Sequence, residues 1–170
     1  TETLFTNNTG FTINNKYNVN IENYIESIGS NIYIFKYNKL NDNELGQTEY
    51  NISFKDQKNV DILLIAGGGA GACLNGGGGG AGTVIYHKNQ KLLGDYKLKI
   101  GKGGTGGYNN IGQNGTDTVL LDNENNTYYN AVGGGGGAGV SGFTNNGGSS
   151  GGLSSYNNEN ISYSNNNTLS

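Results

Sequence analysis

The pattern with the clearest chemical meaning lies between Asp61 and Ala72. It reads Asp-Ile-Leu-Leu-Ile-Ala-Gly-Gly-Gly-Ala-Gly-Ala, an apolar strand followed by the G-x-G-x-x-A spacing typical of dinucleotide-binding turns. That turn binds pyrophosphate only when a helix begins directly after it, and the glycine-rich residues 73–80 disfavour a helix. No acidic residue ends a second strand about 20 positions later, where a ribose contact would need one. The sequence therefore argues against a nicotinamide or flavin enzyme.

The other residues that could do chemistry are few and scattered. His87 is the only histidine, and it ends a predicted strand, where we expect an exposed side chain. Cys73 is the only cysteine, which excludes an internal disulfide and a tetrahedral cysteine metal site, so we interpret it as a small residue packed beside glycine. Asp122 and Glu124 fall in a predicted turn, whereas a calcium loop needs more carboxylates at alternating positions. We therefore predict that the protein is not an enzyme and has no catalytic residues, no cofactor and no metal site.

The composition favours strands and limits the classes of partner. Of 170 residues, 33% are hydrophobic and 14% charged, and the apolar ones are mostly Ile, Val, Leu, Tyr and Phe, which suit half-buried sheet surfaces. The net charge is -3 and the ten cationic side chains form no cluster, which argues against nucleic acid as a partner. No apolar stretch approaches the roughly 18 residues of a spanning helix, which argues against membrane insertion. We expect a connector or edge strands at 1–30, a glycine-rich β domain at 31–153 and an Asn/Ser-rich segment at 154–170.

Alternating apolar and polar residues predict the first strands. Candidates at 32–37 and 48–54 flank the polar segment 38–47, which we interpret as a long hairpin loop. The segment Val60–Ala66 is nearly continuous in apolar residues, so we expect it to be buried on both faces.

Two further hairpins are predicted from the pattern. Segments 83–87 and 95–100 flank a polar loop, and segments 118–121 and 127–132 flank a turn rich in Asp and Asn at 122–126. Asp and Asn favour such turns because their side chains hydrogen-bond to nearby backbone groups.

Glycine-dense blocks alternate with these strands and need a physical explanation. They are Gly67–Ala72, Gly76–Gly82, Gly101–Gly107, Gly133–Gly139 and Gly147–Gly152. Glycine loses the most backbone freedom on ordering, so a structured block must be stabilised by close packing. Flexible linkers are one interpretation, but the blocks directly adjoin strong apolar strands. We favour extended helices with three residues per turn that pack side by side, because only residues without a Cβ let backbones approach closely enough for N–H···O contacts. Collagen is excluded, since there is no Gly-X-Y period and no proline.

The order of these segments resembles the glycine-rich domain of phage tail-fibre adhesins and other virion proteins. The resemblance covers about residues 30–152. It includes the strand ending in Gly67-Gly-Gly, the block 76–83, the hairpin ending in Tyr96-Lys-Leu-Lys-Ile-Gly101-Lys-Gly-Gly104, and the block 131–139. The extracellular glycine-rich region of anaplastic lymphoma kinase is similar in kind.

What the resemblance implies is an all-β fold, a jelly-roll-like β-sandwich combined with packed polyglycine-II helices, used for display and recognition. We therefore expect a virion surface structural or attachment domain of the tail-fibre, spike or fibre type. Its implied partners are other virion or fibre proteins, with a host surface glycan or protein as a further class, and a homo-oligomer is compatible with the sequence. A minor capsid or fibre subunit that binds only other virion proteins, and a secreted cell-surface adhesin, remain open alternatives. The expected location is the virion surface or the extracellular space.

A recognition surface would lie on loops held by the glycine blocks. Aromatic and amide side chains in such loops suit sugars or partner proteins. The candidates are Tyr108, Asn109, Asn110, Phe143, Asn145 and Asn146.

Overall fold

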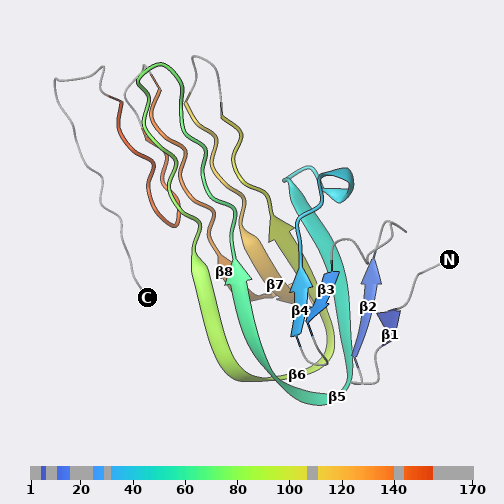
Figure 1. The fold of residues 1–170 in the computed structure, drawn as a ribbon. Helices are drawn as coiled ribbons and strands as arrows, with labels where there is room; N and C mark the ends of the chain where they lie inside the picture. The colour runs from blue at the N-terminus through green and yellow to red at the C-terminus, as the bar shows by residue number, and fades with distance from the viewer. Residues whose placement is uncertain are drawn as a thin grey trace.

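The computed structural model describes residues 5–6, 11–15, 25–28, 32–106, 111–139 and 144–154. In these residues the chain forms antiparallel strands and one short 3-10 helix, η2 (Lys39–Asn41). The strands are β1 (Phe5–Thr6), β2 (Phe11–Asn15), β3 (Ile25–Ile28), β4 (Ile32–Phe35), β5 (Gln47–Ile65), β6 (Val84–Gly101), β7 (Thr118–Asp122) and β8 (Thr127–Ala131). One sheet has the order β1-β2-β5-β6-β7-β8, and β3 pairs with β4 (Figure 1). The predicted all-β class is confirmed.

β5 and β6 form one long antiparallel hairpin that curves back at its middle (Figure 1). Their register shifts twice, once after Phe54 and once after Val60. Bulges of this kind bend a strand pair and increase its twist. At the second shift the Asp61 carboxylate accepts hydrogen bonds from the Asn89 backbone N–H at 2.9 Å and the Tyr86 hydroxyl at 3.1 Å. These two bonds hold β5 and β6 together where the regular ladder is interrupted.

Two predicted boundaries inside this hairpin are wrong. Residues 84–87 of the first predicted segment and residues 95–100 of the second are parts of one strand, β6, so the two segments do not pair with each other as predicted. Segments 48–54 and 60–66 likewise merge in β5, which ends at Ile65. The polar residues between them break the alternation and favour a loop, but here pairing resumes within the curve, from Lys58↔Leu92 to Val60↔Gln90.

The predicted hairpin of segments 32–37 and 48–54 is also corrected. β4 pairs with β3 and not with β5. The connection from β4 to β5 contains η2, and two hydrogen bonds hold it in place. The Asn38 N–H donates to Thr48 Oγ1 at 2.7 Å, and the Thr48 hydroxyl donates to the Asn38 carbonyl at 3.1 Å. Hydrogen bonds between a side chain and the backbone, such as these, cannot be predicted from hydrophobic periodicity.

Short strands form both ends of the large sheet. β1 is the strand at one edge, and β2 lies between β1 and β5, pairing with β5 from Phe11↔Phe54 to Asn15↔Tyr50. β7 and β8 form the predicted hairpin around the Asp/Asn turn. In the part of the chain that the structure describes, no helix has the length and apolar character to span a bilayer.

The hydrophobic core joins both halves of the curved hairpin. Its buried members come from β5, β6, β7, β8 and the residue after β5. They are Tyr50, Ile52, Phe54, Leu64, Ala66, Leu92, Leu98, Leu120 and Ala131. Tyr50 is 1% exposed and its hydroxyl donates to the Lys36 carbonyl at 2.6 Å. The core therefore ties the far arm of the hairpin to the main sheet.

The segment Val60–Ala66 is buried on one face only, which corrects the prediction of two buried faces. Leu64 is 4% exposed, whereas Leu63 and Ile65 are each 57% exposed. Among the described strands, this arm of the sheet has only β5 and β6, and the side chains on its outer face are exposed. A continuous apolar run does not show whether one face of a strand is buried or both, because this depends on the tertiary structure.

Candidate functional site

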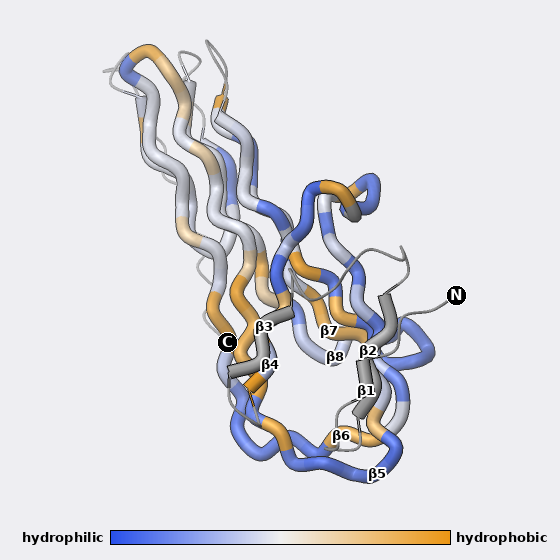
Figure 2. The backbone as a smooth tube through the Cα atoms, turned by 45° about the vertical axis from the view of Figure 1, so that its right-hand side comes forward, coloured by the Kyte–Doolittle hydropathy of each residue, from blue (hydrophilic) through white to orange (hydrophobic). Residues whose placement is uncertain are grey.

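Extended glycine-rich segments stand on one end of the sheet (Figure 1) and have nearly neutral hydropathy along their length (Figure 2). We number them as runs 1 to 6 and call them together the glycine array. They are run 1 (66–72), run 2 (76–83), run 3 (102–106), run 4 (111–117), run 5 (132–139) and run 6 (144–154). No helix occurs between residues 66 and 83, so the dinucleotide-binding spacing lacks the helix N-terminus that pyrophosphate binding needs.

The N–H groups of run 1 donate to two neighbouring runs in steps of three residues. The N–H groups of Ala66, Gly69 and Ala72 donate to carbonyls of run 2, at Thr83, Gly80 and Gly77. The N–H groups of Gly67 and Ala70 donate to carbonyls of run 4, at Thr116 and Gln113. A backbone with three residues per turn presents the same side at every third residue, and this periodicity agrees with such a backbone.

Run 5 lies at the centre of the glycine array. Residues 133–139 are all buried. Its N–H groups at 134 and 137 donate to run 1, and those at 135 and 138 donate to run 6. Its carbonyls accept from runs 2, 4 and 6. Each of these ladders also advances by three residues, so runs from separate parts of the sequence share one period.

Two side chains of run 4 complete the bonding of run 5. Asp117 Oδ1 accepts from the Gly133 N–H at 2.8 Å, and Asn114 Oδ1 accepts from the Gly136 N–H at 2.9 Å. These N–H groups are also three residues apart, on the side that the other runs leave open. Side-chain acceptors therefore replace a further backbone there.

Most glycines of the array cannot be replaced without a clash. A Cβ would overlap a backbone carbonyl of another segment at many positions. Among them are Gly67, Gly69, Gly77, Gly79, Gly80, Gly104, Gly112, Gly115, Gly133, Gly134, Gly135, Gly136, Gly137 and Gly151. At other glycines an added Cβ would fit, and within runs 1 and 3 these glycines lie three residues apart. They are Gly68, Gly71, Gly78, Gly103 and Gly106. The array is thus held by backbone packing inside and has an outer face that tolerates side chains.

Run 4 was not among the predicted glycine blocks. The pattern before β7 suggests an ordinary Asn/Gly turn, because the run has only two glycines, Gly112 and Gly115. Both meet carbonyls of run 1, at Ala70 and Gly67 respectively. Their spacing of three residues is the signal that could have identified the run, because a backbone with three residues per turn places both glycines on the same side.

The structure places two of the six predicted recognition residues inside the array. The Asn145 N–H donates to the Gly136 carbonyl, and its side-chain amide donates to the Gly112 carbonyl at 3.3 Å. The Asn146 carbonyl accepts from the Asn114 side-chain amide at 3.2 Å. These two asparagines therefore connect run 6 to its neighbours. Tyr108, Asn109, Asn110 and Phe143 lie outside the described residues.

Thr118 joins the array to the sheet. It is 1% exposed, and its hydroxyl donates to the Ile65 carbonyl at 2.9 Å while accepting from the Gly101 N–H at 3.0 Å. The last residues of β5 and β6 and the first of β7 thus meet at one hydroxyl. A single buried polar group fixes the point where run 1 begins and where run 3 follows.

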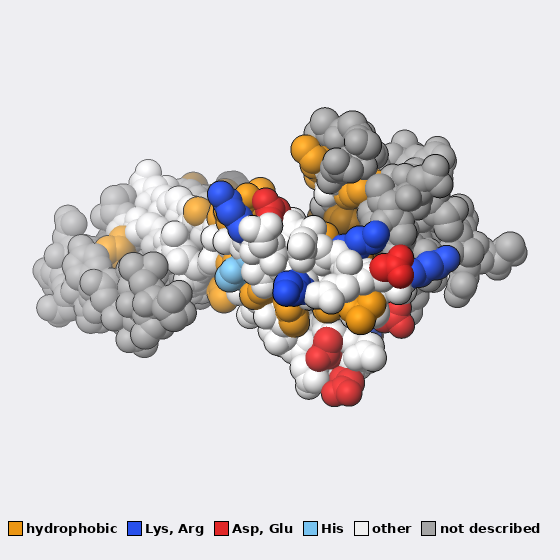
Figure 3. Space-filling model, turned by 90° about the horizontal axis from the view of Figure 1, so that it is seen from below, with side chains coloured by type: hydrophobic (Ala, Val, Ile, Leu, Met, Phe, Trp, Pro, Cys, Tyr) orange, Lys and Arg blue, Asp and Glu red, His pale blue; other side chains and the backbone are white. Residues whose placement is uncertain are grey.

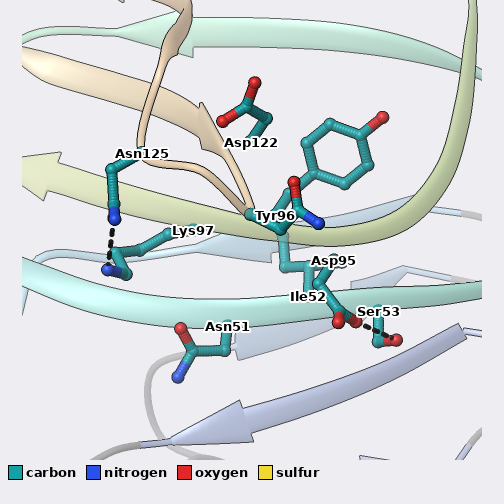
Figure 4. A pocket seen from close by; sticks show the side chains of 9 residues that line it. Asn51, Ile52, Ser53, Asp95, Tyr96, Lys97, Asp122 and Asn125 are labelled. Carbon is teal, nitrogen blue, oxygen red and sulfur yellow. Dashed lines mark hydrogen bonds between the residues drawn. The ribbon is translucent and has the colours of Figure 1, made fainter.

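A polar hollow lies beside residues 95–97 of β6, next to the β7–β8 turn (Figure 4). Its volume is about 370 Å³, at the lower end for small-molecule sites. It is lined by Asn51, Ile52, Ser53, Asp95, Tyr96, Lys97, Asp122, Asn123 and Asn125. Figure 4 shows the Lys97 ammonium directed at Asn125 Oδ1, which it contacts at 2.8 Å, and the Ser53 hydroxyl directed at the Asp95 carboxylate. These two contacts fix groups on opposite sides of the hollow.

The turn next to the hollow is held by Asp122. Its Oδ1 accepts from the backbone N–H groups of Glu124 and Asn126, and its Oδ2 accepts from the Asn126 side chain. Asn125 adopts the left-handed conformation, with φ of 63°, which asparagine tolerates. The predicted role of Asp122 as a turn residue is confirmed.

The pKa of Asp122 gives a direct test of this turn. The Asn126 side-chain amide, followed by the backbone N–H groups of Asn126 and Glu124, holds the pKa of the Asp122 carboxyl below its ordinary value. The stabilisation is therefore complete above the ordinary Asp pKa and is lost as pH falls through the folded value. We predict that Asn126→Ala raises this pKa in a carboxyl-carbon NMR titration. Asn123→Ala, at a turn residue without a bond to Asp122, should leave it unchanged, and an equal rise in both variants would contradict the assignment.

The only histidine lies in a strand, and the only cysteine lies in a turn. His87 lies within β6, half-buried and stacked on Tyr129 with ring centroids 4.1 Å apart, so the predicted exposed strand end is wrong. β6 continues past it because β5 pairs with it at Ile62. Cys73 is a half-buried free thiol at the turn between runs 1 and 2. Among the described residues, no group of three or more His, Cys, Asp or Glu side chains could hold a metal ion.

A β-sheet extended by a backbone-packed glycine array defines a glycine-rich β domain. The sequence model of the glycine-rich domain family matches residues 44–168, so the chain belongs to this family. Comparison with curated proteins and comparison with solved structures each give no match. The predicted resemblance is therefore confirmed at the level of the glycine-rich domain.

Proposed function

We propose that this domain is a non-catalytic structural and attachment module of a virion surface, of the fibre or spike type. The observation that carries the proposal is the three-residue hydrogen-bond period shared by the runs of the glycine array. An array joined by backbone bonds in several directions is stiff, and it holds the outer ends of its runs at a fixed distance from the sheet. Stiff projection is what a display module needs and what a flexible linker lacks.

The finer fold assignment belongs to the same proposal. We propose that the runs are polyglycine-II helices and that the curved hairpin gives the sheet a sandwich-like, two-layered body. The period of three supports the first part. The core that joins residues from both arms of the hairpin supports the second. The described strands β5 to β8 are neighbours in chain order, so the jelly-roll likeness concerns layering rather than connectivity.

Hydrogen exchange of run 1 tests the polyglycine-II assignment. The N–H groups of residues 66, 67, 69, 70 and 72 should exchange slowly, because each donates to another run. Those of Gly68 and Gly71, which donate to no group in the described chain, should exchange fast. A repeating slow, slow, fast pattern is expected by NMR, whereas uniformly fast exchange would show a flexible linker and reject the assignment.

Attachment is tested with the labelled chain on intact host cells and on purified particles of the parent virus. The proposal expects the chain to be found in particles and to bind cells saturably. Binding to other particle proteins without binding to cells would favour the alternative of a minor capsid or fibre subunit. Presence on a cell surface but not in particles would favour a secreted adhesin, and absence from both would reject the proposal.

A further inference from the structure

We propose that the polar hollow next to the β7–β8 turn binds an uncharged sugar unit of a glycan. This inference rests on the proposed attachment role and names the ligand class and its place. The site differs from the predicted loop candidates, because it lies on β5, β6 and the turn 122–126, away from the glycine array.

Several polar groups that line the hollow make no hydrogen bond within the described chain and are available to a ligand. The side chains of Asn51 and Asn123 make no hydrogen bond in the described chain, and Asn125 uses only its carbonyl oxygen, toward Lys97. Asp95 accepts from Ser53 through Oδ1, which leaves Oδ2 free. The register places Asn51 and Asp95 on the same face of the β5–β6 pair, so an amide and a free carboxylate oxygen line the hollow together. Sugar hydroxyl groups both donate and accept, so they match such a mixture.

The hollow is preorganised by contacts outside its ligand-facing groups. The bonds of Asp122 fix the turn, and the bond from Lys97 fixes Asn125 above β6. On the side of Asp122, the Tyr96 ring is held edge-on between Phe54 and Tyr128, with centroid distances of 6.0 and 5.7 Å (Figure 4). Ligand binding would thus order few additional side chains, which lowers its entropic cost.

The charge of the hollow selects against acidic ligands. It contains two carboxylates, Asp95 and Asp122, and one ammonium, Lys97. Both Asp122 oxygens are already bound inside the turn, so the free acceptor is Asp95. On the lower face of the molecule, lysines and acidic residues alternate without a positive patch in the described part (Figure 3). A phosphorylated, sulfated or sialylated ligand would therefore meet a carboxylate and no cationic cluster.

A glycan array probed with the full chain tests the inference. Wild type should bind neutral glycans in preference to acidic ones. Asn51→Ala and Asp95→Ala should each weaken binding to the best neutral glycan by about tenfold in an NMR titration, because each removes a hydrogen-bonding group from the hollow. The matched controls are Asn59→Ala and Asp56→Ala, which change exposed residues of β5 outside the hollow and should bind as wild type does.

Several results would overturn the inference, and they differ from failure of the attachment role. No neutral glycan bound, a preference for acidic glycans, or unchanged binding by Asn51→Ala and Asp95→Ala would each reject it. Saturable binding to cells whose surface glycans have been removed would indicate a protein partner. In that case the attachment proposal stands and the glycan inference falls.

Discussion

Replacing Gly136 by alanine is expected to destabilise the protein by at least about 3 kcal/mol, because the new methyl group would overlap the Gly112 carbonyl oxygen. Gly136 is in run 5, at the buried centre of the array. Run 4 cannot move away from the new methyl group without breaking two hydrogen bonds, one from the Gly112 N–H to run 5 and one from the Gly136 N–H to Asn114. Overpacking and broken hydrogen bonds therefore add to each other.

Gly78→Ala is the matched control, since no atom lies within 4 Å of the added Cβ and the residue is exposed. Its stability should equal that of wild type or exceed it by about 0.5 kcal/mol, because alanine has less freedom in the unfolded chain. Urea unfolding followed by circular dichroism measures both variants. Equal stability of Gly136→Ala and Gly78→Ala would mean that the central run is not tightly packed, and the scaffold interpretation would fail.

Thr118→Val is expected to lower the free energy of unfolding by about 2–4 kcal/mol, although threonine and valine have nearly the same shape. The substitution leaves the Gly101 N–H and the Ile65 carbonyl without their partner at a site that is 1% exposed. Because these groups end β6 and β5, hydrogen exchange should increase first at Gly101 and at the start of run 1. Amide exchange and urea unfolding together locate and quantify this loss.

Thr105→Val provides the control for the same chemical change at an exposed position of run 3. Its effect should stay within about 0.5 kcal/mol, as for most surface substitutions. Thr118→Ser, which keeps the hydroxyl, should retain most of the stability. If Thr118→Ser were as unstable as Thr118→Val, the methyl group and not the hydroxyl would hold the junction.

The fold could be predicted where the signal is local. The turn at Asp122 is recognisable because an Asp side chain bonds to backbone groups two and four residues later. Thr48 shows the opposite case, since it joins two segments through a side chain whose partner, Asn38, is ten residues away. The hollow also escapes prediction, because Asn51, Asp95 and Asn123 become neighbours only through strand register.

The amino-acid sequence alone was sufficient to predict the all-β class, the membership in the glycine-rich family and the β7–β8 hairpin. Composition and short-range alternation encode these properties within a few residues. Only the folded chain decided that 84–87 and 95–100 are one strand, that a segment with two glycines is run 4, and which side of Val60–Ala66 is exposed. Each of these depends on backbone groups far apart in sequence, such as the Gly67 N–H and the Thr116 carbonyl, and glycine carries no side chain that could specify its partner.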